Sequence, residues 1–76
     1  MEHESDIIDA RGLRCPLPVL RLRKALLQVA PGGEVRLWAD DPIAVIDIPH
    51  FCAEESHELR ETQSEGDATL YVVRRG

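Results

Sequence analysis

Cys15 is the residue of this chain that is best placed for chemistry. It is followed directly by Pro16, Leu17 and Pro18, and then by the apolar spacing of an amphipathic helix. Proline fixes φ near the helical value and lacks an N–H, so it suits the first turn of a helix. The free N–H groups of that turn carry partial positive charge and stabilise a thiolate. The sequence therefore predicts an exposed, nucleophilic sulfur of lowered pKa at or beside a helix N-cap.

Basic residues surround this cysteine in the sequence. Five of the nine Lys and Arg residues fall between residues 11 and 24, a stretch without Asp or Glu, although the chain has a net charge of −5. They are Arg11, Arg14, Arg21, Arg23 and Lys24. We expect Arg11 and Arg14 to stabilise an anionic sulfur, while others form the solvated face of a helix. The structural alternative is that Cys15 only caps the helix, where Ser, Thr, Asp and Asn are preferred.

The length and composition limit what the chain can do alone. A chain of 76 residues buries roughly 60% of its unfolded surface, which allows one modest core in a single domain, residues 1–76, and no deep substrate cleft. Partner proteins are therefore expected to complete any active site. No apolar run approaches the roughly 20 residues that span a bilayer, and the acidic start does not resemble a signal peptide. We expect a cytoplasmic monomer with one or two free thiols and no membrane contact.

The hydrophobic pattern predicts four strands and two helices in the order βαβαββ. Strands are expected at residues 6–9, 34–39, 57–63 and 68–74, and helices at 16–30 and from 42 to about 55. Asp41 is expected to cap the second helix, and Pro49 to bend it or divide it in two. Residues 64–67 predict a hairpin turn. The expected fold class is α/β in the broad sense, an α+β two-layer sandwich with both helices on one face of a four-stranded mixed sheet.

The same pattern predicts which side chains face the core. In the first helix the apolar side is expected to hold Val19, Leu20, Leu22, Leu26, Leu27 and Val29. In residues 34–39 the alternation predicts that Val35, Leu37 and Ala39 share one face. Trp38 is then expected on the open face of the sheet.

Two segments resemble the TusA (SirA-like) sulfur-carrier family. The first is Asp9-x-x-Gly12-Leu13-x-Cys15-Pro16-x-Pro18 before an apolar helix, and the second is Asp40-Asp41-Pro42 followed by Asp47-Ile48-Pro49-x-Phe51-Cys52. The second segment is most similar to the TusA branch of the family, and the resemblance runs from about Ile8 to Arg75. It implies the βαβαββ two-layer fold and a sulfurtransferase that relays sulfur as a persulfide and depends on partner proteins.

The resemblance also implies roles for single residues. Cys15 falls on the sulfur-bearing cysteine, Pro16 and Pro18 on structural prolines, and Gly12 on the glycine that lets the strand turn closely into the helix. Arg14 occupies the position before the thiol, where the family often has a basic or polar residue. The implied partners are a cysteine desulfurase or rhodanese-like sulfur donor and a downstream acceptor protein, with no cofactor. The best-known route leads to 2-thiouridine in tRNA, and other members serve sulfur oxidation or molybdenum cofactor maturation.

Persulfide transfer requires an exposed nucleophile of low pKa more than it requires a large pocket. No general base is apparent near Cys15 along the sequence, and a thiolate that already exists at neutral pH needs none. His50 stands where a small residue is expected in the closest relatives, and its role is left open.

Other interpretations remain open at the level of sequence. Cys52 is expected to be a small core residue, and the alternative is a resolving thiol that pairs with Cys15. A zinc site built from Cys15, His50, Cys52 and His57 is disfavoured, because no pair has the C-x-x-C spacing of structural sites. A regulatory or protein-interaction module, whose basic patch binds an acidic partner, is the functional alternative. Direct nucleic-acid binding is not expected, because the net charge is negative and the few aromatic residues form no stacking platform.

Overall fold

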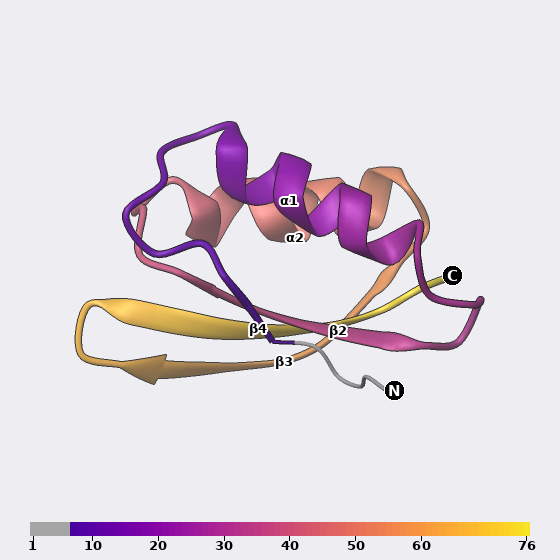
Figure 1. The fold of residues 1–76 in the computed structure, drawn as a ribbon. Helices are drawn as coiled ribbons and strands as arrows, with labels where there is room; N and C mark the ends of the chain where they lie inside the picture. The colour runs from indigo at the N-terminus through magenta and orange to yellow at the C-terminus, as the bar shows by residue number, and fades with distance from the viewer. Residues whose placement is uncertain (1–6) are drawn as a thin grey trace.

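The computed structural model describes residues 7–76 and contains two helices and four strands. These are β1 (Ile7–Asp9), α1 (Leu17–Leu26), β2 (Glu34–Ala39), α2 (Ala44–Glu54), β3 (Glu58–Glu65) and β4 (Ala68–Arg74). Both helices lie side by side over one face of the sheet (Figure 1). The element order and the two-layer arrangement confirm the predicted fold class. Residue 6, the predicted first residue of β1, lies outside the described residues.

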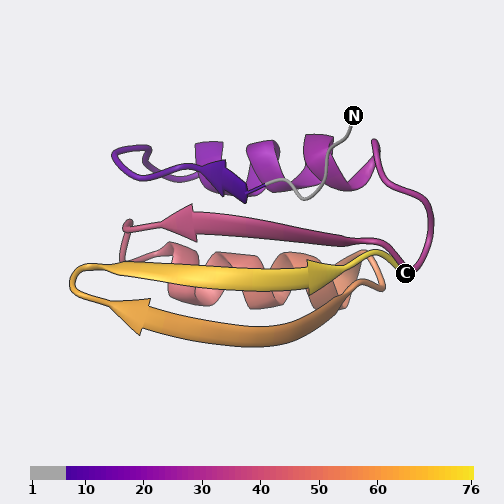
Figure 2. The same cartoon turned by 60° about the horizontal axis from the view of Figure 1, so that its bottom comes forward.

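The sheet has the strand order β1-β2-β4-β3 (Figure 2). β1 pairs with β2 in parallel, while β2 with β4 and β4 with β3 are antiparallel. The hairpin between β3 and β4 turns over Gly66 and Asp67 alone, because Glu65 and Ala68 already pair. Gly66 has a φ of 61°, which suits a two-residue hairpin turn. The turn is therefore shorter than the four residues predicted for it.

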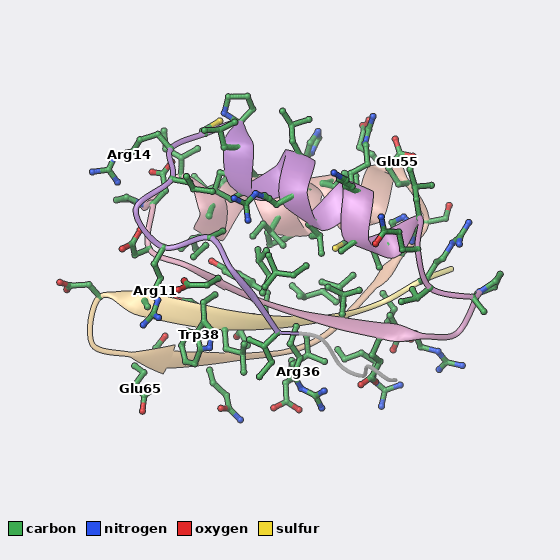
Figure 3. The ribbon with its side chains drawn as sticks, viewed as in Figure 1. Arg11, Arg14, Arg36, Trp38, Glu55 and Glu65 are labelled. Carbon is green, nitrogen blue, oxygen red and sulfur yellow. The ribbon has the colours of Figure 1, made fainter. Side chains whose placement is uncertain are left out.

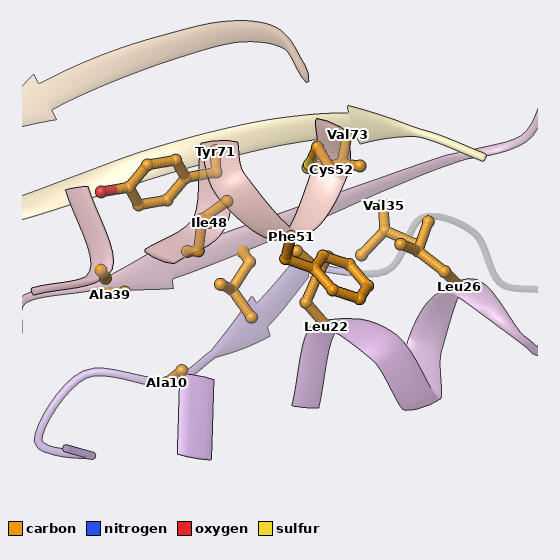
Figure 4. Close-up of a cluster of buried hydrophobic side chains, with 12 residues drawn as sticks. Ala10, Leu22, Leu26, Val35, Ala39, Ile48, Phe51, Cys52, Tyr71 and Val73 are labelled. Atoms are coloured by element: carbon orange, nitrogen blue, oxygen red, sulfur yellow. The ribbon is translucent and has the colours of Figure 1, made fainter. Parts of the chain in front are cut away.

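The core lies between the helices and the sheet, as Figure 4 shows. Val35, Leu37 and Ala39 alternate along β2 and are buried, as the sequence predicted. They pack with residues of β4 and of both helices, among them Tyr71, Val73, Leu22, Leu26, Ile48 and Phe51. Trp38 points to the opposite, open face of the sheet, where the guanidinium of Arg11 lies 5.9 Å from its ring centroid (Figure 3).

β3 forms one edge of the sheet and differs in character from the other strands. Seven of its eight residues are exposed, and only Leu59 is half-buried against the core. Its pairing with β4 shifts in register between Leu59 and Glu61, so one residue bulges out of the ladder.

α1 is shorter than predicted, and its buried side is narrower. The helix ends at Leu26 instead of residue 30, because residues 28 and 29 donate to carbonyls three residues back, as in a tight terminal turn. Leu22 and Leu26 are buried, whereas Leu20 and Leu27 are 49% and 69% exposed. Leu20 lies about 200° from Leu22 around a helix of 3.6 residues per turn, which places it on the solvent side. The prediction that Leu20 and Leu27 face the core is therefore wrong.

α2 also departs from its prediction. It begins at Ala44 instead of residue 42, and it runs without interruption through Pro49 to Glu54. Pro49 lacks the N–H that would bond to the carbonyl of Val45, but Val45 is 59% exposed, so this carbonyl lies on the solvated side of the helix. The helix is therefore not divided in two, which was one of the two outcomes predicted for Pro49.

We predict that Leu22→Ala lowers the free energy of unfolding by about 2–5 kcal/mol, because Leu22 is fully buried and its removal leaves a cavity. Leu27→Ala, at the residue directly after this helix, is the matched control, and it should change stability by no more than about 0.5 kcal/mol. Urea unfolding followed by circular dichroism measures both values. Equal losses in the two variants would contradict the orientation of α1 described above.

Candidate functional site

The candidate site is built where the connection from β1 to α1 meets the connection from β2 to α2. Because β1 and β2 are parallel neighbours, their carboxyl ends lie at the same end of the sheet, and both connections leave from there (Figure 1). The N–H of Gly12 donates to Asp40 Oδ1 at 2.9 Å, and the N–H of Cys15 donates to Asp41 Oδ2 at 2.6 Å. Two carboxylates of the second connection therefore hold the backbone of the first.

Gly12 gives the first connection its shape. Its φ is +84°, in the left-handed region that side chains rarely adopt, and nothing lies within 4 Å of the position where a Cβ would stand. The requirement for glycine is therefore conformational and not steric. This geometry lets the chain turn from β1 back over the sheet and present its N–H to Asp40.

Cys15 lies directly before α1, at the position that the prolines predicted. Pro16 is the N-cap residue, Pro18 is the second residue of the helix, and the Cys15–Pro16 peptide bond is cis. The thiol is exposed. Neither proline can donate a hydrogen bond, so the N-terminus of this helix offers fewer N–H groups to an anion than an ordinary one.

The thiol has a carboxylate as its immediate partner. Cys15 Sγ donates to Asp47 Oδ2 at 2.8 Å. Asp47 lies in the first turn of α2. This hydrogen bond raises the pKa of Cys15; partial removal from water and the negative charges of Asp47 and Asp41 act in the same direction. The predicted lowering of the pKa of Cys15 is therefore wrong. The physical reason is that a direct carboxylate contact outweighs the partial charge of a helix end that has lost donors to proline.

The basic residues of the sequence do not gather around the sulfur as predicted. Arg11 makes two hydrogen bonds to the carboxylate of Asp9, at 2.8 and 3.0 Å, and these hold the pKa of Asp9 at about 2. Arg11 points towards Trp38, away from the thiol (Figure 3). Arg23 contacts Glu55 at 3.4 Å. The expectation that Arg11 stabilises an anionic sulfur is therefore wrong.

Arg14 is the basic residue that stays near the site. It lies at the far end of the loop, close to the start of α1 (Figure 3). Its charge helps to hold the pKa of Asp41 below its ordinary value, after the larger contributions of the N–H groups of Cys15 and Ile43. Its part in sulfur chemistry stays a prediction.

Sequence reasoning missed Asp40 and Asp47 as members of the site. Both residues stand in the second segment that resembles the TusA family, far from Cys15 along the chain. The signal that points to these carboxylates is topological. Two parallel neighbouring strands end at one edge of a sheet, so the residues that follow them meet there.

The remaining candidates are placed away from the site. Cys52 is 2% exposed and belongs to the core cluster, where burial raises the pKa of its thiol. His50 is exposed, with its Nε2 at 3.6 Å from Glu54. Within residues 7–76, no three His, Cys, Asp or Glu side chains are grouped to hold a metal ion, and no helix is long and apolar enough to cross a membrane.

A small groove lies between the two helices, next to Pro16 and to Asp47, the hydrogen-bond partner of the thiol. It has a volume of about 250 Å³ and is lined by residues that include Pro16, Val19, Arg23, Asp47 and Phe51. Typical small-molecule pockets are about 300–1,000 Å³. The geometry favours a reaction in which a second protein supplies the other reacting atom.

Comparison with known proteins agrees with this geometry. The family model described as "Sulfurtransferase TusA" matches residues 6–75. The chain is 45% identical over 76 residues to the sulfur carrier protein TusA of Pseudomonas aeruginosa, covering 99% of this chain and 96% of that protein. A protein of the same description from Pseudomonas paraeruginosa is equally similar. The crystal structure of a SirA-like protein from Desulfitobacterium hafniense superposes with a TM-score of 0.81 at 26% identity, covering 92% of this chain and 96% of that one.

We predict that iodoacetamide at mildly alkaline pH modifies Cys15 and spares Cys52 in the folded protein, because only Cys15 is exposed. Peptide mass spectrometry before and after unfolding in urea locates the label. Cys15→Ser is the control, and it should take up label only once unfolded. Comparable labelling of both cysteines in the folded protein would contradict the burial of Cys52.

Asp41→Asn should make the protein less stable at neutral pH, because the charged form of Asp41 accepts two backbone hydrogen bonds and its pKa is lowered by folding. A lowered carboxyl pKa contributes stability above the unfolded value of about 3.9, and this contribution is lost as the pH falls through the folded value. The difference between wild type and variant should therefore shrink in acid. Urea midpoints from neutral pH down to about pH 3 measure it, with the exposed Glu65→Gln as a control that shows no such trend.

Proposed function

The chain belongs to the TusA family of sulfurtransferases and sulfur carriers, and we propose that Cys15 is the residue that carries the sulfur. The observation that carries this proposal is the exposed Cys15 thiol at the start of α1, held in place by its N–H bond to Asp41. The sulfur travels as a persulfide on Cys15, from one partner protein to another. The size of the groove next to Asp47 supports partner dependence, because it leaves little room for a substrate at this site.

The transfer needs no oxidant or reductant. The Cys15 sulfur attacks the outer sulfur of a persulfide on the donor, the S–S bond of the donor breaks, and a new S–S bond forms on Cys15. The donor leaves as a thiolate and receives the proton that Cys15 has lost. In the second transfer the acceptor thiolate attacks the outer sulfur of the Cys15 persulfide, and Cys15 leaves as a thiolate.

We propose a cysteine desulfurase or a rhodanese-like protein as the donor and a thiol-bearing protein as the acceptor. The route towards 2-thiouridine in tRNA is the first candidate, and sulfur oxidation and molybdenum cofactor maturation are the alternatives within the family. Contact with tRNA is proposed to be indirect, since the net charge of −5 opposes a polyanion. A reducing, cytoplasmic setting fits a reaction that depends on a free thiol.

The second candidate function is a protein-interaction module in which Cys15 takes no part in chemistry. Exposed basic side chains on α1, such as Arg21 and Lys24, favour an acidic partner surface. The two functions differ in their dependence on the thiol.

We predict that incubation with a cysteine desulfurase and cysteine adds one sulfur atom to the protein, removable by reductant. Intact-mass spectrometry should show this gain in wild type and in Cys52→Ala, and not in Cys15→Ser. A gain that persists in Cys15→Ser would overturn the assignment of the carrier residue. The absence of any gain with both donor classes would favour the interaction module, which should then bind its partner equally well in Cys15→Ser.

A further inference from the structure

Two carboxylates flank the reacting group of this protein, Asp47 through the thiol and Asp41 through the backbone N–H. Asp47 Oδ2 accepts the thiol hydrogen at 2.8 Å, and Asp41 Oδ2 accepts the N–H of the same residue at 2.6 Å. Within the described residues 7–76, no Lys, Arg or His forms an ion pair with either carboxylate. This arrangement is the reverse of the electropositive setting in which reactive cysteines are usually found.

We propose that Asp47, supported by Asp41, keeps Cys15 as an unreactive thiol in the free protein, and that a partner bearing a cationic side chain beside its own sulfur releases it. The inference rests on the proposed function, because it describes how the same thiol is regulated. The partner that fits is a protein surface on which Lys or Arg adjoins a cysteine persulfide or an acceptor cysteine.

The charged groups around Asp47 come from every element packed against it. Asp41 and Asp40 belong to the connection between β2 and α2, and Arg14 lies in the connection before α1. On the helices, Arg23 is held by Glu55 at 3.4 Å, and His50 lies 3.6 Å from Glu54. Arg23 and His50 each already lie beside another carboxylate, whereas the carboxylate of Asp47 has the Cys15 thiol as its hydrogen-bonded partner.

The consequence for reactivity follows from thiol chemistry. The thiolate is the nucleophile in sulfur exchange, so the rate depends on the fraction of Cys15 that is ionised. The contact with Asp47 and the negative charge of Asp41 raise the pKa of Cys15 and so reduce this fraction. A cation brought to Asp47 by a partner would pair with the carboxylate and withdraw it from the thiol. The free protein would then be slow with small electrophiles and oxidants and fast with a matching partner.

The first test measures alkylation by iodoacetamide as a function of pH in a Cys52→Ala background. Asp47→Asn keeps the shape of the side chain and removes its charge, so the apparent pKa of Cys15 should fall and the rate at neutral pH should rise, about tenfold for one pKa unit. Glu65→Gln is the matched control, because Glu65 is an exposed carboxylate on the edge strand β3, away from the groups named above, and it should leave the rate unchanged. Asp47→Glu keeps the charge and should stay slow.

The second test asks whether the site selects cationic sulfur compounds. Cystamine carries two ammonium groups, and hydroxyethyl disulfide is its neutral counterpart of the same length. The ratio of their rate constants with Cys15 should be several-fold larger in wild type and Glu65→Gln than in Asp47→Asn. Comparing ratios between variants cancels the intrinsic difference between the two disulfides. If Asp47→Asn does not fold, as judged by circular dichroism, Asp47→Ser replaces it in both tests.

An unchanged alkylation profile or an unchanged disulfide ratio in Asp47→Asn would overturn the proposal. Neither experiment uses a sulfur donor, so its result is separate from that of the sulfur-loading assay. If the protein takes up sulfur from a donor but the disulfide rate ratio is unchanged in Asp47→Asn, control of the thiol by Asp47 is refuted and the carrier function stands. If the disulfide rate ratio falls in Asp47→Asn but wild type takes up no sulfur from a donor, control of the thiol by Asp47 is supported and the carrier function is refuted.

Discussion

The site depends on two hydrogen bonds, in which Asp40 accepts the N–H of Gly12 and Asp41 accepts the N–H of Cys15. These two hydrogen bonds join segments that lie 28 and 26 residues apart in the chain. They fix the loop that presents Cys15 and set the position of the thiol relative to α2. Because β1 and β2 are parallel, the sheet itself brings the two connections to one edge, and the carboxylates then fasten one to the other.

The protonation of the thiol is decided by two opposing effects of different range. A helix N-terminus offers about half a unit of positive charge, spread over its free N–H groups. In this protein, prolines at residues 16 and 18 remove two of the possible donors, while Asp47 places a full negative charge at hydrogen-bonding distance. The local contact prevails. A position at a helix start therefore does not by itself specify a thiolate, and the groups that face it from other elements have to be known.

The fold could be predicted because its determinants are local. Three of these determinants act within a few positions: the alternation in residues 34–39, the turn residues Gly66 and Asp67, and the prolines at the start of α1. The predictions failed where the outcome depends on residues distant in sequence. Leu20 and Leu27 are apolar, but the sheet covers only the side of α1 that holds Leu22 and Leu26. Pro49 does not divide α2, because the carbonyl that it leaves free belongs to an exposed residue. Asp47 reaches Cys15 only through the tertiary fold.

The polar edge strand β3 has a consequence for how the protein behaves at high concentration. An uncovered strand at the edge of a sheet can pair with the edge of another molecule and start polymerisation. β3 carries Glu58, Arg60, Glu61 and Glu65, and its bulge near Leu59 breaks the regular row of backbone donors and acceptors. A like-charged, irregular edge disfavours growth of the sheet from one molecule to the next. The protein can therefore be abundant without its sheets joining into fibrils along this strand.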